Sequence, residues 1–204
     1  IDGMKNPGTA FIYSNLVHAG GIELFAEVLK YNGYLEFKEN KNEYIINNDT
    51  IDYRTGYTYN YFKKNKLNIE DFYPATYLLI TGTSDEGGDE IPEIKQKIIR
   101  NIFNSVSNKD GKFLKFILGS KVMSEGVTLE NVKEVHILDV YYNLGRVEQV
   151  IGRAIRMCKH QDVITKDNFF PKVNVYRYVA SLDGKLSTDE ILYQKAEKKY
   201  LLVK

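Results

Sequence analysis

Short apolar runs alternate along the chain with segments whose apolar residues recur at helical spacing. Residues 9–13 form an apolar run that ends at Ser14-Asn15, which predicts a buried strand. After Gly20-Gly21, apolar residues recur on one face as far as Asn32-Gly33, which predicts a helix. The same patterns predict further strands at residues 34–37, 77–81, 113–118, 135–139 and 173–179, and helices at about 92–104, at 145–158 and from 187 onward.

Strands that alternate with helices favour an α/β fold, here a doubly wound parallel sheet with helices on both faces. In such sheets, ligands bind at the carboxyl ends of the strands. The turn at Ser14, the turn after residue 81 and the loop or short helical turn at residues 119–126 all follow predicted strands. We therefore expect these three segments to meet at one edge of the sheet.

Residues 38–75 are more polar than the flanking segments and rich in Asn and Tyr, and we interpret them as an insertion. The alternation at Tyr57, Tyr59 and Tyr61 predicts an exposed hairpin. Nearby basic residues such as Lys63 leave open that the tyrosines stack on unpaired bases, although simple packing of the insertion is the commoner role. The predicted domain organisation is a lobe over residues 1–180, including this insertion, and a helical extension over 181–204.

The start of the predicted C-terminal helix has a recognisable cap. Ser187 and Glu190 stand three residues apart and form a capping box, in which each side chain accepts a hydrogen bond from the other residue's amide.

Composition limits the possible partners. The chain of 204 residues has 28 basic and 27 acidic residues, so any nucleic-acid contact must come from a local face. Cys158 is the only cysteine, which rules out an internal disulfide, and no metal site is expected. No run of eighteen apolar residues occurs, so no membrane partner is expected. The sequence starts without Met and leads directly into a strand, so we expect it to be part of a longer protein.

The helix predicted at 145–158 carries the strongest chemical signal. Its polar stripe repeats at i, i+3, i+7 and i+10, while Val147, Val150, Ile151, Ala154 and Met157 would face the sheet. The stripe consists of Arg146, Gln149, Arg153 and Arg156. Two arginines one turn apart form a permanently charged clamp suited to phosphate. A solvated basic face is the alternative, and the stripe alone does not decide between them.

Several segments resemble the motifs of superfamily 2 helicases. Residues 149–156 resemble motif VI, Q-x-x-G-R-x-x-R, at every fixed position, and residues 119–129 resemble motif V. Residues 11–15 are similar to motif IV, and residues 81–84 lie where a further strand-end turn of this domain meets nucleic acid. The order and spacing resemble those of the C-terminal, or second RecA-like, domain. Val140 departs from the family, whose members often have Pro there.

Within the superfamily, the chain is most similar to the transcription-associated helicases and ATPases of large nucleocytoplasmic DNA viruses. Residues 80–82, 108–111 and 135–156 carry this likeness. The resemblance implies a viral protein of the host cytoplasm or virion, with the transcription machinery as a partner. If the protein is not viral, an intracellular location is expected. The tail resembles the closing helix of remodeller-like members, which slightly favours duplex translocation.

The resemblance also implies roles for individual residues. Arg153 and Arg156 would reach the γ-phosphate of ATP as arginine fingers, with Gln149 positioning them or the nucleotide. The residues expected beside the nucleotide are Glu125, Gly126, Thr128 and Gly152. The residues expected on the DNA or RNA backbone are Ser14, Gly82, Thr83, Ser120 and Lys121, whose contacts would carry no sequence code. Capping of local turns remains the alternative for Thr83 and Ser120, as does simple solvation for Lys121.

The sequence has no phosphate-binding loop of its own. Gly111-Lys112 lacks the preceding glycine loop, and no acidic magnesium motif is present. ATP with Mg²⁺ would therefore be bound mainly by an N-terminal RecA-like lobe of the same polypeptide, and we expect this chain to be inactive by itself. A non-catalytic nucleic-acid-binding module derived from a helicase lobe is the alternative function. A nucleotide-binding transferase is disfavoured because no Gly-rich turn follows the first strand.

Overall fold

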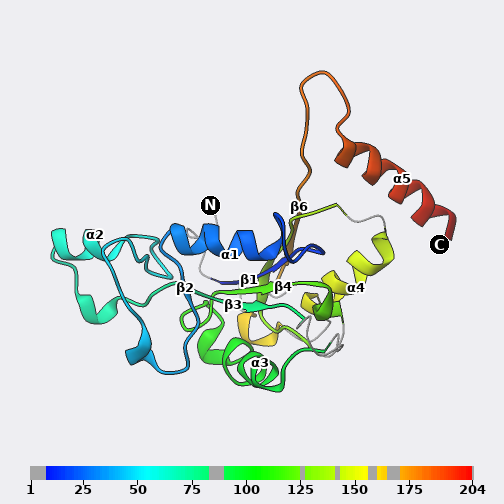
Figure 1. Cartoon of the computed structure of the whole chain (residues 1–204). Helices are drawn as coiled ribbons and strands as arrows, with labels where there is room; N and C mark the ends of the chain where they lie inside the picture. The colour runs from blue at the N-terminus through cyan, green and yellow to red at the C-terminus, as the bar shows by residue number, and fades with distance from the viewer. Residues whose placement is uncertain are drawn as a thin grey trace.

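A six-stranded parallel sheet forms the centre of the computed structural model, which describes residues 8–82, 90–124, 127–140, 143–155, 160–164 and 171–203 (Figure 1). The strand order is β2-β3-β4-β1-β5-β6, and every pairing is parallel. The strands are β1 Thr9–Tyr13, β2 Leu35–Glu36, β3 Thr76–Ile80, β4 Phe116–Gly119, β5 Val132–Ile137 and β6 Asn174–Arg177. Each predicted strand is present, with ends that differ by a few residues from the expected ones.

Helices cover both faces of this sheet, as the doubly wound fold requires. Helix α1 (Ile22–Tyr31) lies on one face, whereas α3 (Glu93–Ile98) and α4 (Leu144–Ala154) lie on the other (Figure 1). A π-helix over Ile99–Phe103 continues α3. The remaining helices are α2 (Tyr59–Lys64), α5 (Thr188–Val203) and the short 3-10 turns Lys41–Glu43, Ile69–Asp71, Val106–Asn108, Lys121–Ser124 and Gln161–Val163.

Strand β1 shows why the apolar runs predicted strands so well. Successive side chains of a strand point to opposite faces, so a strand covered on both sides must be apolar throughout. Phe11 and Tyr13 are buried in the core on the α3 and α4 side. Ala10 and Ile12 are buried in a second core, against Ile22 and its neighbours on α1.

The insertion is compact but is not a hairpin at the tyrosines, so that prediction was wrong. Residues 59–64 form α2, whose first turn is capped by Thr58, with Oγ1 accepting a hydrogen bond from the Tyr61 amide at 3.2 Å. Tyr57 stacks on Tyr61 with ring centroids 4.2 Å apart. Tyrosines at alternate positions include a pair four residues apart, here Tyr57 and Tyr61. The stacking of this pair and the Thr58 cap favour the helix over a strand. Within the described residues, antiparallel pairing in the insertion consists of two isolated bridges, Ile51 with Thr58 and Asp52 with Pro74.

Strand β6 leads into a tail that extends away from the sheet (Figure 1). Arg177 of β6 forms a 2.7 Å ion pair with Glu148 of α4. The predicted capping box at the start of α5 is confirmed, because the Ser187 amide donates to Glu190 Oε2 at 2.7 Å and the Glu190 amide donates to Ser187 Oγ at 3.1 Å. Among the described residues, no helix has both the length and the apolar surface needed to cross a membrane.

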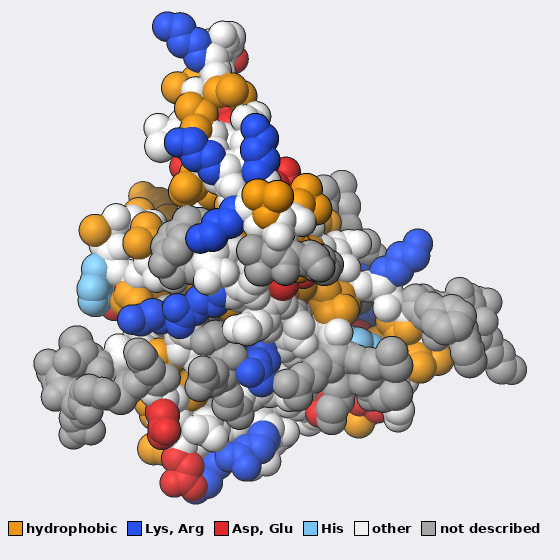
Figure 2. All heavy atoms as spheres, turned by 90° about the vertical axis from the view of Figure 1, so that its right-hand side faces the viewer, with side chains coloured by type: hydrophobic (Ala, Val, Ile, Leu, Met, Phe, Trp, Pro, Cys, Tyr) orange, Lys and Arg blue, Asp and Glu red, His pale blue; other side chains and the backbone are white. Residues whose placement is uncertain are grey.

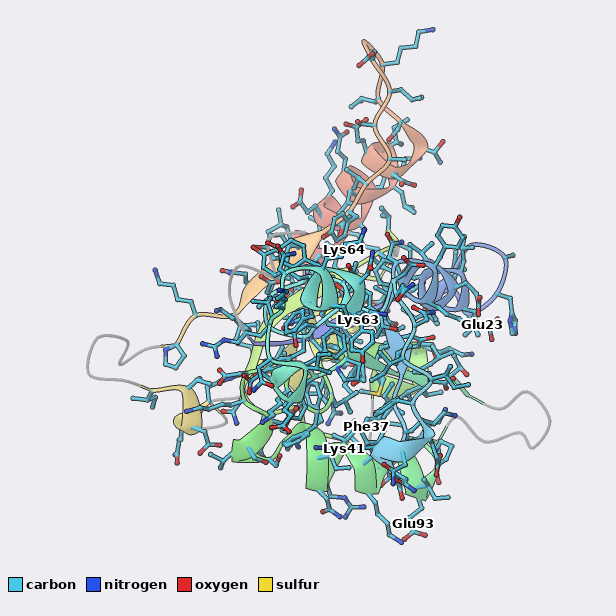
Figure 3. All side chains as sticks on the ribbon, turned by 90° about the vertical axis from the view of Figure 1, so that its left-hand side faces the viewer. Glu23, Phe37, Lys41, Lys63, Lys64 and Glu93 are labelled. Carbon is cyan, nitrogen blue, oxygen red and sulfur yellow. The ribbon has the colours of Figure 1, made fainter. Side chains whose placement is uncertain are left out.

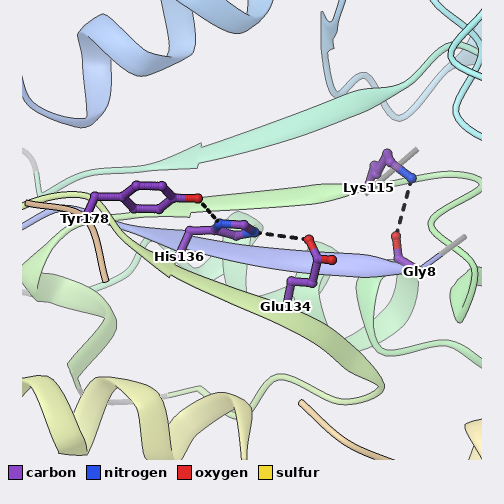
Figure 4. A network of polar contacts seen from close by, with 5 residues as sticks. All are labelled: Gly8, Lys115, Glu134, His136 and Tyr178. Carbon is purple, nitrogen blue, oxygen red and sulfur yellow. Dashed lines mark hydrogen bonds and ion pairs between the residues drawn. The ribbon is translucent and has the colours of Figure 1, made fainter. Parts of the chain in front are cut away.

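A polar network lies on the α1 side of β5 and β6 (Figure 4). His136 Nδ1 lies 2.9 Å from the Tyr178 hydroxyl, and His136 Nε2 lies 3.2 Å from Glu134 Oε2. The imidazole also stacks on the Tyr176 ring at 4.9 Å. His136 therefore ties the edge strand β6 to β5.

Candidate nucleotide and nucleic-acid edge

Backbone hydrogen bonds draw the carboxyl ends of the central strands together at one edge. The Ser14 amide donates to the Gly119 carbonyl at 3.1 Å, and the Ser120 amide donates to the Ile80 carbonyl at 3.1 Å. The turns after β1, β3 and β4 therefore lie side by side, as the sequence predicted. Figure 2 views the molecule from the side of α4 and this edge, with Lys and Arg side chains spread across the face.

Ser14 is buried, and its hydroxyl serves the local turn. Oγ donates to the Leu16 carbonyl at 2.8 Å and lies 3.1 Å from the Leu16 amide. Next to it, the Asn15 amide donates to Asp139 Oδ1 at 2.8 Å. Burial raises the pKa of Asp139, and the hydrogen bond from the Asn15 amide partly offsets this rise. Asp139 was not predicted as a residue of this edge, although its position two residues after the end of β5 was a usable signal.

Ser120 is fully buried directly after β4, and its Oγ has no hydrogen-bond partner among the described residues. Its hydroxyl therefore does not cap the following turn, which was the alternative role considered for it. The preceding Gly119 is in close contact, because a Cβ there would lie 2.5 Å from Met123 Cγ and 2.9 Å from Phe11 Cε2. Glycine thus allows the 3-10 turn at Lys121–Ser124 to pack onto the strand end.

The other predicted backbone-contacting residues lie around the same edge. Lys121 is exposed in the 3-10 turn after β4, and Gly82 is half-buried two residues after β3 ends. Thr83 lies outside the described residues. The strand ends therefore bring Ser14, Gly82, Ser120 and Lys121 to one side of the sheet.

Helix α4 holds the predicted arginine stripe. Its cap is Asn143, whose side chain accepts from the Arg146 amide at 3.2 Å, so the helix begins one residue earlier than predicted. The helix ends at Ala154 within the described residues, whereas the prediction extended it to Cys158, which lies outside them. Four residues predicted to face the sheet are buried: Val147, Val150, Ile151 and Ala154. Leu144, the first residue of the helix, is buried as well.

Three of the four stripe residues are described, and all lie on α4. Arg146 and Arg153 are half-buried, and Gln149 is exposed. At Gly152, beside Arg153, an added Cβ would meet nothing within 4 Å. Packing within the described part of this chain therefore does not require glycine there, which leaves room for an approaching ligand or partner. Arg156 lies outside the described residues.

A backbone contact joins this helix to the segment that precedes β5. The Leu129 amide donates to the Arg153 carbonyl at 3.1 Å. The adjacent Thr128 carbonyl accepts from Asn104 Nδ2 at 2.9 Å, and Asn104 Oδ1 accepts from the Glu130 amide at 2.9 Å. Thr128, predicted to lie beside the nucleotide, is thus one residue from the contact that anchors Arg153. Asn104 had no signal in the sequence beyond its polarity at the end of an amphipathic helix.

Two neighbouring residues of α4 have the chemistry expected at a phosphate-binding surface. Arg153 supplies positive charge, and Gly152 supplies a surface without a side chain for close approach. Within the described ranges, no group of three or more His, Cys, Asp or Glu side chains is placed to hold a metal ion. Glu125 and Gly126, also predicted beside the nucleotide, lie outside those ranges.

The fold and this edge define the class: an α/β domain of RecA-like architecture with an arginine-bearing helix beside its strand ends. The family model of the helicase conserved C-terminal domain matches residues 7–158. The chain belongs to this family of helicase C-terminal domains.

Several of its relatives are viral proteins. Two from Acanthamoeba polyphaga mimivirus bear the name putative ATP-dependent RNA helicase. The first is 50% identical over 204 residues, covering 99% of this chain and 18% of the relative. The second is 33% identical over 183 residues, covering 90% of this chain and 25% of the relative. The early transcription factor 70 kDa subunit of Melanoplus sanguinipes entomopoxvirus is 28% identical over 161 residues, covering 79% of this chain and 22% of the relative. The chain thus spans about a quarter or less of the length of these curated relatives.

Proposed function

We propose that this chain is the second motor lobe of an ATP-dependent nucleic-acid helicase or translocase, and that it acts in viral transcription. Membership of the helicase C-terminal family supports the motor, and a relative named as an early transcription factor subunit supports the setting. The observation that carries the proposal is the placement of Arg153 on α4, beside the open surface of Gly152 and fixed through its backbone to Leu129.

In this proposal Arg153, together with Arg156, contacts the γ-phosphate of ATP that is bound by a preceding lobe of the same polypeptide. A guanidinium at that position stabilises the charge that develops on the transferred phosphoryl group, and such a finger contributes about 10³–10⁵ in rate. Gln149 lies one turn before Arg153 on the same stripe and would orient it or the nucleotide. Glu125, Gly126 and Thr128 would line the side of the nucleotide facing this lobe.

The second half of the proposal concerns DNA or RNA. Ser14, Gly82, Thr83, Ser120 and Lys121 would contact the sugar-phosphate backbone at the strand ends. The backbone hydrogen bonds from Ser14 to Gly119 and from Ser120 to Ile80 support this, since they bring the turns that carry these residues together at one edge of the sheet. Closure of the two lobes around ATP and their reopening after hydrolysis would shift these contacts along the strand.

The test is nucleic-acid-stimulated ATP hydrolysis by the full-length protein with Arg153→Ala. We expect kcat to fall by about 10³-fold or more, with nucleic-acid affinity in the absence of ATP unchanged. Arg100→Ala is the matched control, because Arg100 is an exposed arginine of the π-helix that follows α3. Hydrolysis that is equally fast in both variants would contradict the arginine-finger role and favour a non-catalytic binding module.

A further inference from the structure

A cavity of about 480 Å³ lies where the insertion meets the far side of the domain. Its walls come from three segments far apart in the sequence: residues 37–46, residues 70–76 and residues 101–113. Figure 3 looks onto this side and shows Phe37 and Lys41 close together below α2. The volume lies within the range of sites that hold small ligands. The cavity shares no residue with the edge described above.

The interior of this cavity is aromatic. Its lining includes the rings of Phe37, Tyr44, Phe72, Tyr73 and Phe113. Hydrogen bonds involving the backbone amide of Tyr73 and the hydroxyl of Tyr44 hold two of these residues in place. The Tyr73 amide donates to the buried Asp52 at 3.0 Å, and the Tyr44 hydroxyl lies 3.0 Å from the Lys38 amide. These rings therefore form a fixed apolar surface before any ligand arrives.

Two ammonium groups lie directly on this aromatic surface. Lys112 Nζ is 4.0 Å from the Tyr73 ring centroid, and Lys41 Nζ is 4.9 Å from the same centroid. Both also lie over Phe113, at 5.8 and 5.2 Å. In the part of the chain that the structure describes, neither lysine forms an ion pair, although Glu39 and Glu70 line the same cavity.

We propose that this cavity binds a nucleotide unit of an unpaired nucleic-acid strand, with the base against the aromatic rings and the phosphate on Lys41 and Lys112. Aromatic rings and lysines are the two components that bind single strands without sequence preference. A planar base matches the flat aromatic walls, and the adjacent phosphate would supply a negative counter-charge for the two ammonium groups. Asn101, exposed at the same cavity, could hydrogen-bond to a base edge.

The site deepens the proposed motor function, since a second contact outside the strand-end edge would hold a strand that the motor has separated. The insertion then has a role of its own. It supplies Tyr73 and Lys41, while the body of the domain supplies Lys112 and Phe113. A peptide without acidic side chains could also occupy an aromatic cavity, but it would leave both ammonium groups without a counter-charge.

The test measures binding of a fluorescein-labelled oligothymidylate of about eight nucleotides to the chain by anisotropy. We expect Phe113→Leu, which keeps the apolar bulk and loses the aromatic face, to weaken binding by about fivefold or more. Lys112→Gln should weaken binding and reduce its salt dependence. Lys64→Gln is the matched control, because Lys64 is an exposed lysine of α2 that does not line the cavity. Glu70→Gln removes a negative charge from the cavity wall and should tighten binding.

Photo-crosslinking with 5-iodouracil oligonucleotides, followed by peptide mapping, separates this site from the strand-end edge. Crosslinks to Tyr44, Tyr73 or Phe113 are the expected result. Crosslinks confined to the edge near Ser120, with wild-type affinity in Phe113→Leu and Lys112→Gln, would overturn the cavity site and leave the proposed motor function intact. Failure of the Arg153→Ala test, with cavity crosslinks present, would overturn the motor function alone.

Discussion

The amide of Leu129 donates a hydrogen bond to the carbonyl of Arg153 at 3.1 Å. This contact joins the last turn of α4 to the segment that precedes β5. Leu129 itself is fully buried, so the segment is fixed in the core on one side and holds the arginine's backbone on the other. The position of Arg153 therefore depends on the residues that hold this segment.

Asn104 is the residue that holds it, and its replacement gives the first prediction. Its side chain bonds to the Thr128 carbonyl and the Glu130 amide, both at 2.9 Å. In Asn104→Ala, both backbone groups lose a partner, which costs about 1–3 kcal/mol of stability. We expect faster amide exchange at residues 128–130 and a lower kcat for ATP in the full-length protein. A variant with faster exchange but unchanged kcat would show that Arg153 is positioned by other contacts.

Gly152 gives the second prediction, because its effects on stability and on activity should have opposite signs. Alanine is favoured over glycine in a helix by about 0.5–1 kcal/mol, and the added Cβ would meet nothing within 4 Å. Gly152→Ala should therefore raise the urea midpoint of this chain. If a nucleotide or a preceding lobe approaches this surface, the same change should lower the ATPase activity of the full-length protein.

Gly119→Ala is the contrasting variant for that experiment. Its Cβ would overlap Met123 and Phe11 at 2.5 and 2.9 Å, so we expect a loss of about 1–3 kcal/mol in stability. A Gly152→Ala protein that is both more stable and fully active would contradict the role of Gly152 beside the nucleotide.

Lys115 gives a prediction about pH. Its side chain is only 1% exposed, and burial lowers its pKa from 10.5 to about 8, with the Glu134 carboxylate opposing the shift. Among the described residues, the ammonium group of Lys115 makes a single hydrogen bond, a long one of 3.5 Å to the Gly8 carbonyl (Figure 4). Between pH 8 and 10.5, the unfolded chain binds more protons than the folded one, so this group makes stability rise with pH. Below about pH 8 the cost of the buried charge is fully present.

Lys115→Met should therefore raise the free energy of unfolding at pH 7 by roughly 1–3 kcal/mol. The advantage over wild type should shrink as the pH rises from 8 toward 10.5, as measured by urea unfolding at both ends. Lys64→Met, at an exposed position, should show neither effect. An advantage that does not change with pH would mean that packing, and not the buried charge, sets the stability at this position.

The sequence by itself determined the parallel α/β fold, because a strand covered on both faces must be apolar throughout, as in β1. It also determined the apolar and polar faces of α4 and the capping box at Ser187, since these depend only on residues within a few positions of one another. The motif spacing likewise placed Arg153 and Gly152 on one helix. Local periodicity is sufficient for all of these features.

Only the tertiary structure decided the rest. The tyrosines at positions 57–61 fit a strand pattern and a helical pair equally well, and the Thr58 cap and the Tyr57–Tyr61 stack decided for the helix. Asn104 reaches backbone groups 24 and 26 residues away, and the aromatic cavity is assembled from three distant segments. Such contacts depend on where the packed sheet brings segments together, and no local pattern in the sequence records that.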